Sequence, residues 1–556
     1  MGKLPRLKLL SCIRSRYPWA ILAGLLLAAS LPKISVAGLA WVAPGLILLA
    51  AVGTNGRQTF RIGYAAGLAH YLASLYWLLL IPVRGFPILG WAALSAFMAL
   101  YPATWTWLCW KLFPAKMDGK GSASSVENLA EQFFTVPWAS RMLWTITGAA
   151  SWVALEMIAA RFLGGFPWNI LGSSQYKLVP LIQIASITGI YGLSFLVVWS
   201  ALSILCAAAI VVRRPAKRSA WVAEIILPMF AVAALCFTGS QKLLRSKTNS
   251  PEVTVALIQP SIPQSLIWDP LEDSHRFNEL LQLSTTAAKE KPDIILWPEA
   301  ALPRMLRYDR EIYEATTGLA RSNHAWMIIG SDDEEPKPHA TSPRDADHFN
   351  ASFLISPDGR LVERYKKRNL VIFGEYVPFS GWMPFLKYFT PIDGFFTPGD
   401  RITPFQLEDP HVKISVLICF EDVFPHFARE YVDDDTDFLV NLTNDGWFGD
   451  GAAQWQQGAA GIFRAVENGV PLVCCSNNGL TCWIDANGRL RQIFESKEHG
   501  IYGEGFLVAH IPALAIGEKR AATFYRAHGD VFGWSCVAFV LLQFIRTVAA
   551  NRLHKT

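Results

Sequence analysis

Residues 414–422 read Ile-Ser-Val-Leu-Ile-Cys-Phe-Glu-Asp. The first five are apolar or β-branched apart from one serine, which is typical of a short buried strand. The run ends at Cys419, and the carboxylates of Glu421 and Asp422 follow at once. In open α/β sheets, ligands bind at the carboxyl ends of the strands. The stretch therefore predicts an α/β domain with a thiol placed where such domains carry out chemistry.

Similar strands lie on both sides of this one. The further predicted strands are Val253–Ile258, Ile294–Trp297, Trp326–Gly330, Asp437–Leu442 and Leu472–Cys475. Helical stretches are predicted at Arg276–Lys289, Glu311–Ser322 and Gln454–Glu467. Asp358-Gly359 and Asn487-Gly488 each join two apolar runs, and these dipeptides are strong hairpin signals. Residues 250–517 are thus predicted to form one layered α/β sandwich.

The rest of the chain is apolar enough to cross a membrane. The 556 residues are 52% hydrophobic and only 17% charged, against roughly 25% charged in a soluble domain. A helix of about 20 apolar residues crosses a bilayer. Candidate spans lie near 18–32, 36–53, 63–82, 88–110, 142–160, 184–212, 219–239 and 529–548. We expect a membrane domain of seven helices in residues 1–245 and a last transmembrane helix in 528–549.

The charges that flank these spans predict their orientation. One set of flanks carries 18 Lys and Arg residues, whereas the opposite short loops carry only Lys33, Arg84, Arg161 and Lys177. Positive flanks stay in the cytoplasm. Both termini are therefore expected inside, and residues 250–517 outside. The net charge of +5 gives no strong case for nucleic-acid binding.

Three reactive side chains each follow a predicted strand directly. They are Glu299, Lys367 and Cys419, and one crevice could hold all of them. A carboxylate can take the thiol proton, the thiolate can attack a carbonyl, and an ammonium can stabilise the thiolate and the oxyanion. Taken singly, each has an ordinary structural explanation: a core thiol, a solvated hairpin end and a carboxylate at a helix start.

The motifs around these residues are more specific as a set. They are Trp297-Pro-Glu-Ala, Tyr365-Lys-Lys-Arg-Asn-Leu-Val-Ile-Phe-Gly-Glu-Tyr-Val-Pro, Ile418-Cys-Phe-Glu-Asp, Asn444-Asp-Gly-Trp-Phe-Gly and Ser476-Asn-Asn-Gly. The first three resemble the catalytic signatures of the nitrilase superfamily. Together with Phe166-Pro-Trp-Asn-Ile-Leu-Gly in the membrane part, they resemble the apolipoprotein N-acyltransferase family over essentially the whole chain.

This resemblance implies an α-β-β-α nitrilase-like domain on a membrane domain of about eight helices, in the bacterial inner membrane with the catalytic domain on the periplasmic side. It also implies a reaction in two steps. Cys419 would take an acyl chain from a phospholipid, and the N-terminal amine of a diacylglyceryl-cysteine lipoprotein would take it from the thioester. Glu299 would be the base and Lys367 the oxyanion stabiliser. Glu375 and Glu421 would support them.

Substrate contacts are expected from Trp447, Asn478, Phe379 and Trp382. The last two belong to residues 376–399, an aromatic segment that either fills the core or forms a lid toward the bilayer. The sequence departs from the family pattern at Ile372, Phe420, Gln457 and Ile462. None of these is in the proposed triad, so the departures bear on substrate details.

Two other functions compete with acyl transfer. A membrane-tethered amidase would hydrolyse its thioester with water, but it would not need eight spans. A catalytically silent lipid- or lipoprotein-binding scaffold would not need Glu299, Lys367 and Cys419 together. There is no HExxH or CxxC motif, so we expect no metal site, and no cofactor is implied.

Overall fold

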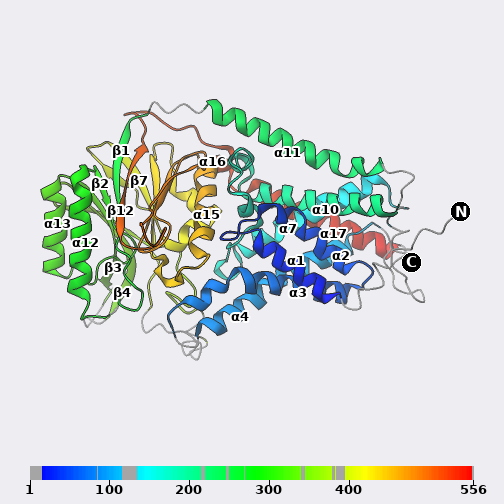
Figure 1. Cartoon of the computed structure of the whole chain (residues 1–556), viewed down its shortest axis with the longest axis horizontal. Helices are drawn as coiled ribbons and strands as arrows, with labels where there is room; N and C mark the ends of the chain where they lie inside the picture. Colours follow the sequence, from blue (N-terminus) through cyan, green and yellow to red (C-terminus); the bar gives the residue numbers. More distant parts are fainter. Residues whose placement is uncertain are drawn as a thin grey trace.

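The chain forms a helical bundle with an α/β domain at one end (Figure 1). The computed structural model describes residues 16–83, 86–114, 133, 135–213, 219–245, 250–267, 269–339, 345–378, 382 and 395–553. The strands lie in one half of the molecule and the long apolar helices in the other. The division follows the hydropathy pattern of the sequence.

The bundle contains long helices that run between the end at the α/β domain and the remote end, together with shorter helices and helical turns. In chain order they are α1 (Tyr17–Ala29), η2 (Ala37–Trp41), α2 (Ala43–Ala51), α3 (Gly56–Ser74), η3 (Tyr76–Leu80), α4 (Phe86–Met98), α5 (Leu100–Lys111), α7 (Trp138–Ala159), α10 (Tyr191–Arg213), α11 (Ala220–Arg245) and α17 (Val531–Leu553). Short turns η4 (Phe162–Gly164), η5 (Leu171–Gln175), α8 (Val179–Ile182) and α9 (Ala185–Thr188) join α7 to α10.

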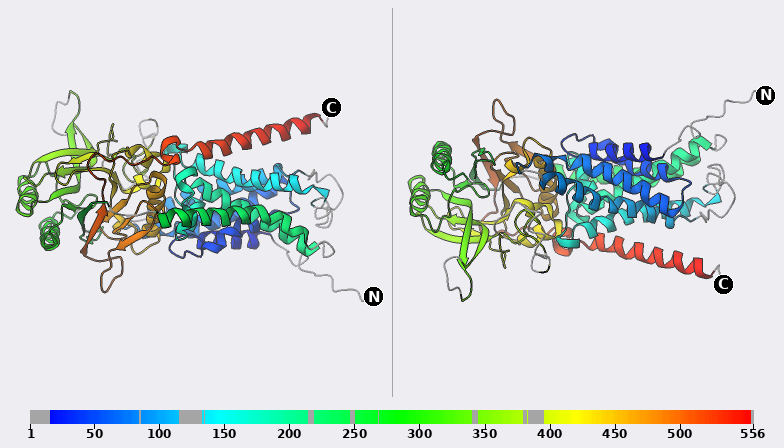
Figure 2. Two further views of the ribbon diagram at one scale, coloured as in Figure 1. Left: turned by 90° about the horizontal axis from the view of Figure 1, so that it is seen from above. Right: turned by 90° about the horizontal axis from the view of Figure 1, so that it is seen from below.

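Five of these segments are long and apolar enough to span a bilayer, counting only the described residues. They are Pro87–Lys111, Trp138–Ala159, Tyr191–Val212, Ala220–Arg245 and Val531–Ala550. The helix α1 is apolar but shorter. α17 leads away from the α/β domain, and its last described residue lies at the opposite end of the molecule (Figure 2). The chain is a multi-span membrane protein, as its composition predicts.

Two six-stranded sheets make up the α/β domain. The first has the order β12-β1-β2-β3-β4-β5 and the second the order β11-β10-β9-β8-β7-β6. The strands of the first sheet are β1 (Glu252–Gln259), β2 (Ile294–Leu296), β3 (Trp326–Pro336), β4 (Ala346–Ile355), β5 (Leu361–Lys366) and β12 (Gly505–Pro512). Those of the second are β6 (Phe405–Leu407), β7 (Val412–Ile418), β8 (Phe438–Thr443), β9 (Leu472–Ser476), β10 (Cys482–Ile484) and β11 (Leu490–Ile493).

Helices cover the outer face of each sheet. α12 (Asp273–Ala287) and α13 (Arg310–Asn323) lie on the first sheet at the far end of the molecule (Figure 1). On the other side, α15 (Ala453–Asn468) lies between the second sheet and the bundle, near α14 (Pro425–Ala428) and α16 (Phe524–His528). The result is the predicted α-β-β-α sandwich. All six predicted strands and both hairpins are confirmed, whereas the edge strands β6 and β12 were missed.

Strand direction brings the chemistry to one end of the sandwich. β1, β2 and β3 are parallel neighbours, and so are β7, β8 and β9. The inner faces pack together, since Val255, Leu257 and Leu296 share one core with Val416 and Val440. Because both parallel sets end at the same edge, the residues after β2 and β7 face each other across the sandwich.

A single side chain connects the α/β domain to three segments of the bundle. Gln456 of α15 accepts hydrogen bonds from the indoles of Trp77 and Trp168, at 3.0 and 2.7 Å. It donates to the carbonyls of Pro32 and Ser74, at 2.9 and 3.1 Å. The buried Gln456 amide therefore makes all four of its possible hydrogen bonds where the α/β domain meets the bundle.

We predict that Gln456→Leu lowers stability markedly. The substitution leaves two buried indole N–H groups and two carbonyls without partners, and each loss costs about 1–3 kcal/mol. A fall of several degrees in the Tm of the purified full-length protein is expected. Gln282→Leu on the exposed face of α12 is the control, with an effect within about 0.5 kcal/mol. Equal Tm values for the two variants would contradict the role given to Gln456.

Candidate active site

Cys419 stands on a sharp turn between a strand and a helical turn. It follows the end of β7 and opens η9 (Cys419–Val423), with a φ of 53°. This left-handed conformation is costly for a residue other than glycine and persists only where neighbours enforce it. Here the Cys419 carbonyl accepts hydrogen bonds from Asn441 Nδ2 at 3.2 Å and Gln457 Nε2 at 2.9 Å. The partly buried thiol is therefore presented by a fixed backbone.

Glu299 lies just beyond the end of β2 and is only 8% exposed. Pro298 has no N–H to extend the strand. Glu299 Oε1 accepts from Asn350 Nδ2 at 2.7 Å and from Lys367 Nζ at 3.2 Å. Its Oε2 accepts from the backbone N–H of Asn444 at 3.0 Å. Three donors thus hold the carboxylate in one orientation.

Lys367 follows β5 and is 1% exposed. Its ammonium lies between two carboxylates, 3.2 Å from Glu299 Oε1 and 2.9 Å from Glu375 Oε1. Burial by itself would lower the pKa of Lys367, but the two carboxylates outweigh it and raise that pKa well above its usual value. Lys367 is therefore a permanent cation and a hydrogen-bond donor at neutral pH.

The thiol lies within electrostatic reach of both groups. Burial raises the pKa of Cys419 well above its usual value, and the Glu299 carboxylate raises it further. The Lys367 ammonium and a hydrogen bond with Thr443 act in the opposite direction. The resting Cys419 side chain is consequently a thiol, and to act as a nucleophile it would need a base to remove its proton.

Glu375 and Glu421 have different structural roles. Glu375 accepts from Lys367 through Oε1 and from the Val371 N–H through Oε2, so it orients the lysine. The fully buried Glu421 accepts from the N–H groups of Ile418, Arg368 and Asn369 at 2.7–3.0 Å. It therefore ties the turn at Cys419 to the loop after Lys367. Burial raises its pKa to about 7, while those backbone donors lower it.

The four residues expected to contact substrate differ in how close they lie to Glu299, Lys367 and Cys419. Trp447 lies in η11 (Asp445–Phe448), next to the Asn444 backbone that holds Glu299. Asn478 instead accepts from the N–H of Gly503 through Oδ1 at 3.2 Å. Trp382 is 92% exposed. Phe379, like most of residues 376–399, lies outside the described residues.

Two site residues were missed from the sequence. Asn350 of β4 donates to both Glu299 and Glu375, at 2.7 and 3.0 Å. Asp332 of β3 pairs with it across the sheet. Burial raises the pKa of Asp332 to about 7, and the Glu299 and Glu375 carboxylates add to that effect. The sequence did contain a signal for Asn350, because it is an amide side chain inside the buried run Phe349–Ile355.

Among the described residues, no cluster suits a metal ion.

The turn at Cys419 contacts the bundle through aromatic rings. Phe420 stacks on Trp168 with 6.0 Å between ring centroids, and lies 6.2 Å from Phe166. Both partners lie in the loop between η4 and η5. The turn at Cys419 is therefore adjacent to the helical bundle.

Both the α/β domain and the N-terminal helical part of the chain match known protein families. Residues 254–513 match the family described as carbon-nitrogen hydrolase, and residues 23–203 match the apolipoprotein N-acyltransferase N-terminal domain. The apolipoprotein N-acyltransferase of Geobacter metallireducens is 34% identical over 94% of this chain and 94% of its own length. Those of Shewanella oneidensis and Rickettsia prowazekii are 30% and 28% identical. They cover 91% and 88% of this chain and 90% and 89% of their own.

Alkylation of Cys419 should depend steeply on pH. Because burial keeps the thiol protonated, the rate with iodoacetamide is expected to rise about tenfold per pH unit through the neutral and alkaline range. Lys367→Met removes the cation that stabilises the thiolate, so it should slow the reaction further. Intact-mass analysis follows the adduct, with Cys419→Ser as the control. A rate that is flat between about pH 6 and 9 would show a thiolate already formed.

Proposed function

Because the chain belongs to the apolipoprotein N-acyltransferase family, we propose that Glu299, Lys367 and Cys419 carry out its acyl transfer. The enzyme N-acylates lipoproteins through a cysteine-based mechanism. The observation that carries the residue assignment is the buried Lys367 ammonium, which contacts the Glu299 carboxylate and acts electrostatically on the Cys419 thiol. Base, donor and nucleophile are thereby held close together.

In the first step, Glu299 takes the thiol proton as Cys419 Sγ attacks an ester carbonyl of the phospholipid. The negative charge that develops on the carbonyl oxygen is stabilised by the Lys367 ammonium. The C–O bond of the ester then breaks, and Glu299 returns the proton to the departing oxygen. A lysophospholipid leaves, and the acyl chain remains as a thioester on Cys419.

In the second step, the neutral N-terminal amine of the diacylglyceryl-cysteine attacks the thioester. Glu299 takes a proton from the nitrogen, the C–S bond breaks, and the amide product leaves. Glu299 then returns the proton to the Cys419 thiolate. The thioester remains on the enzyme after the first product has left, so the reaction follows ping-pong kinetics. Glu375 and Asn350 hold Lys367 and Glu299 in position during both steps.

The acyl-enzyme provides a direct test. The purified full-length protein incubated with phosphatidylethanolamine should gain the mass of one acyl chain, and Cys419→Ala should gain none. Glu299→Gln should slow formation of the adduct by at least about 100-fold, since it removes the general base. Glu314→Gln, which removes an exposed carboxylate of α13, is the matched control. An adduct of normal yield in Cys419→Ala would refute the assignment of the nucleophile.

We further propose that the α/β domain faces the periplasm from the inner membrane. Arg57 and Arg61 lie near the start of α3, whereas Ser74 at its other end contacts Gln456 of the α/β domain. The excess of positive charge at the remote helix ends supports a cytoplasmic location for those ends.

A reporter inserted in the turn between β3 and β4, after Lys337, tests this orientation. A phosphatase that folds only outside the cytoplasm should be active there, and a cytoplasm-dependent fluorescent protein should be dark. The same pair of reporters fused after Leu553 should give the reverse result. Fluorescence from the insertion after Lys337 would place the α/β domain in the cytoplasm.

A further inference from the structure

The carbonyl of Cys419 is held by two amides that come from different elements. Asn441 of β8 and Gln457 of α15 both donate to it, and both side chains are buried. Cys419 itself has the left-handed backbone conformation, with a φ of 53°. Without the two donors it could relax to the more favourable right-handed region, which would redirect its side chain. The two amides therefore help to fix the direction of the thiol.

Asp422 hydrogen-bonds to both of these amides. Its Oδ2 accepts from Asn441 Nδ2 at 2.6 Å, and its Oδ1 accepts from Gln457 Nε2 at 3.1 Å. Because an amide nitrogen carries two N–H groups, each amide can donate once to Asp422 and once to the Cys419 carbonyl. One carboxylate thus orients both donors, and we call the set of Asp422, Asn441 and Gln457 the carbonyl clamp.

Within the described part of the chain, only the contacts at its nitrogen fix the orientation of Asn441. Its Oδ1 is buried and has no hydrogen-bond partner there. If the amide turned over, that oxygen would face both the Asp422 carboxylate and the Cys419 carbonyl, and both contacts would be repulsive. Asp422 consequently helps to keep the N–H groups of Asn441 toward Cys419.

Asp422 is costly in this position. It is fully buried, and burial raises its pKa to about 8. The hydrogen bonds from Asn441 and Gln457 and the charge of Arg464 act in the opposite direction. Arg464, however, forms its own ion pair with Glu467 at 2.8 Å. The two amides are thus the main compensation for a carboxylate whose burial is unfavourable.

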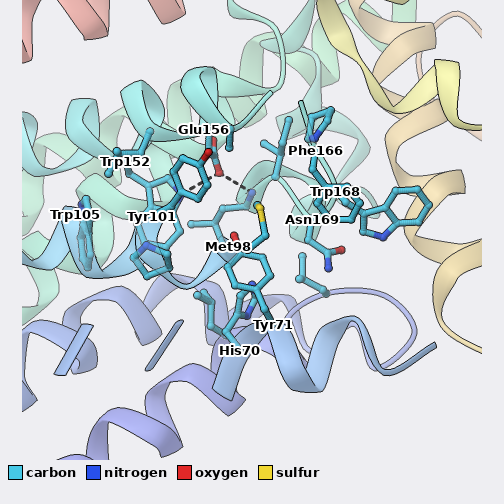
Figure 3. Close-up of a pocket in the computed structure, with 18 residues that line it drawn as sticks. His70, Tyr71, Met98, Tyr101, Trp105, Trp152, Glu156, Phe166, Trp168 and Asn169 are labelled. Atoms are coloured by element: carbon cyan, nitrogen blue, oxygen red, sulfur yellow. Dashed lines mark hydrogen bonds between the residues drawn. The ribbon is translucent and has the colours of Figure 1, made fainter. Parts of the chain in front are cut away.

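Other contacts hold the rest of the turn but not this carbonyl. Phe420 packs on Trp168 and Phe166, which line a pocket between the helices of the bundle (Figure 3). Glu421 accepts from backbone N–H groups, among them that of Ile418. None of these contacts involves the carbonyl of Cys419, so that group depends on the carbonyl clamp.

We propose that Asp422 is a positioning residue, which orients Asn441 and Gln457 so that both donate to the Cys419 carbonyl and fix the direction of the thiol. The inference rests on the proposed acyl transfer, whose first step needs Sγ aligned with Glu299 and the ester carbonyl. A misplacement of about 1 Å can slow a reaction about 100-fold. Loss of the carbonyl clamp should therefore slow thioester formation and leave the affinity for lipid unchanged.

Two variants of the full-length protein separate positioning from a purely structural role. Asp422→Asn presents one oxygen and one NH₂ group, so one partner amide must turn its own oxygen toward the Cys419 carbonyl. Added Asn441→Asp restores a donor and an acceptor between positions 422 and 441, but it places an oxygen against that carbonyl. The double variant thus repairs the contact between the two side chains without repairing the carbonyl clamp.

Intact-mass measurements follow the first turnover at a series of phosphatidylethanolamine concentrations. Both variants should form the thioester about 10–100-fold more slowly at saturating lipid, with a half-saturating concentration within about twofold of the unsubstituted protein. Asp435→Asn, which removes an exposed carboxylate, is the control and should keep the full rate. The proposal is overturned by an unchanged rate in Asp422→Asn, by recovery of the rate in the double variant, or by a loss confined to the half-saturating concentration.

Hydrogen exchange measures the turn without the reaction. Peptides that cover residues 419–423 should exchange about tenfold faster in both variants than in Asp435→Asn. Unchanged exchange there, or an increase spread evenly over the α/β domain, would overturn the carbonyl clamp. If the unsubstituted protein forms no thioester, the proposed acyl transfer fails, and hydrogen exchange alone decides the role of Asp422. If Asp422→Asn does not fold, Gln457→Met removes one donor and should change both measurements in the same direction.

Discussion

The buried Lys367 ammonium is the interaction on which the rest of the site depends. It is 1% exposed, and an isolated charge in such a place would be very costly. Two carboxylates from different segments compensate it, Glu299 after β2 and Glu375 in the loop beyond β5. The same arrangement keeps the lysine protonated and directs it toward the thiol. Structural stability and the proposed catalysis therefore rely on one set of contacts, and substitution of any member should disturb both.

Close backbone approach makes this geometry possible. A Cβ on Gly330 would lie 2.3 Å from the carbonyl oxygen of Pro298 and 2.7 Å from the Cα of Glu299. Only glycine allows β3 to pass so near the turn that carries the base. On the opposite sheet, Glu421 binds three backbone N–H groups and holds the left-handed turn at Cys419. Backbone contacts thus fix both sides of the site, which suits the proposed reaction, because it requires close alignment of base and nucleophile.

The contacts between α15 and the bundle place the site of the α/β domain beside the membrane segments. Neighbouring amides on α15 act on both sides of the joint: Gln456 bonds to the membrane segments, and Gln457 bonds to the carbonyl of Cys419 at 2.9 Å. Gln457 is one of the departures from the family pattern. Its amide supplies a hydrogen-bond donor to the backbone of Cys419.

Local pattern was enough to predict the division into membrane and α/β parts, the six inner strands, both hairpins and three reactive residues at strand ends. Each of these depends on hydropathy, residue period or turn chemistry over a few neighbours. The edge strands β6 and β12, the bridging role of Asn350 and the contacts that Gln456 makes with the bundle could not be predicted in this way. They depend on residues far apart in the chain that meet only when the sheets and helices pack. A side chain whose partners come from other elements has no local signature, so tertiary structure alone decides what it does.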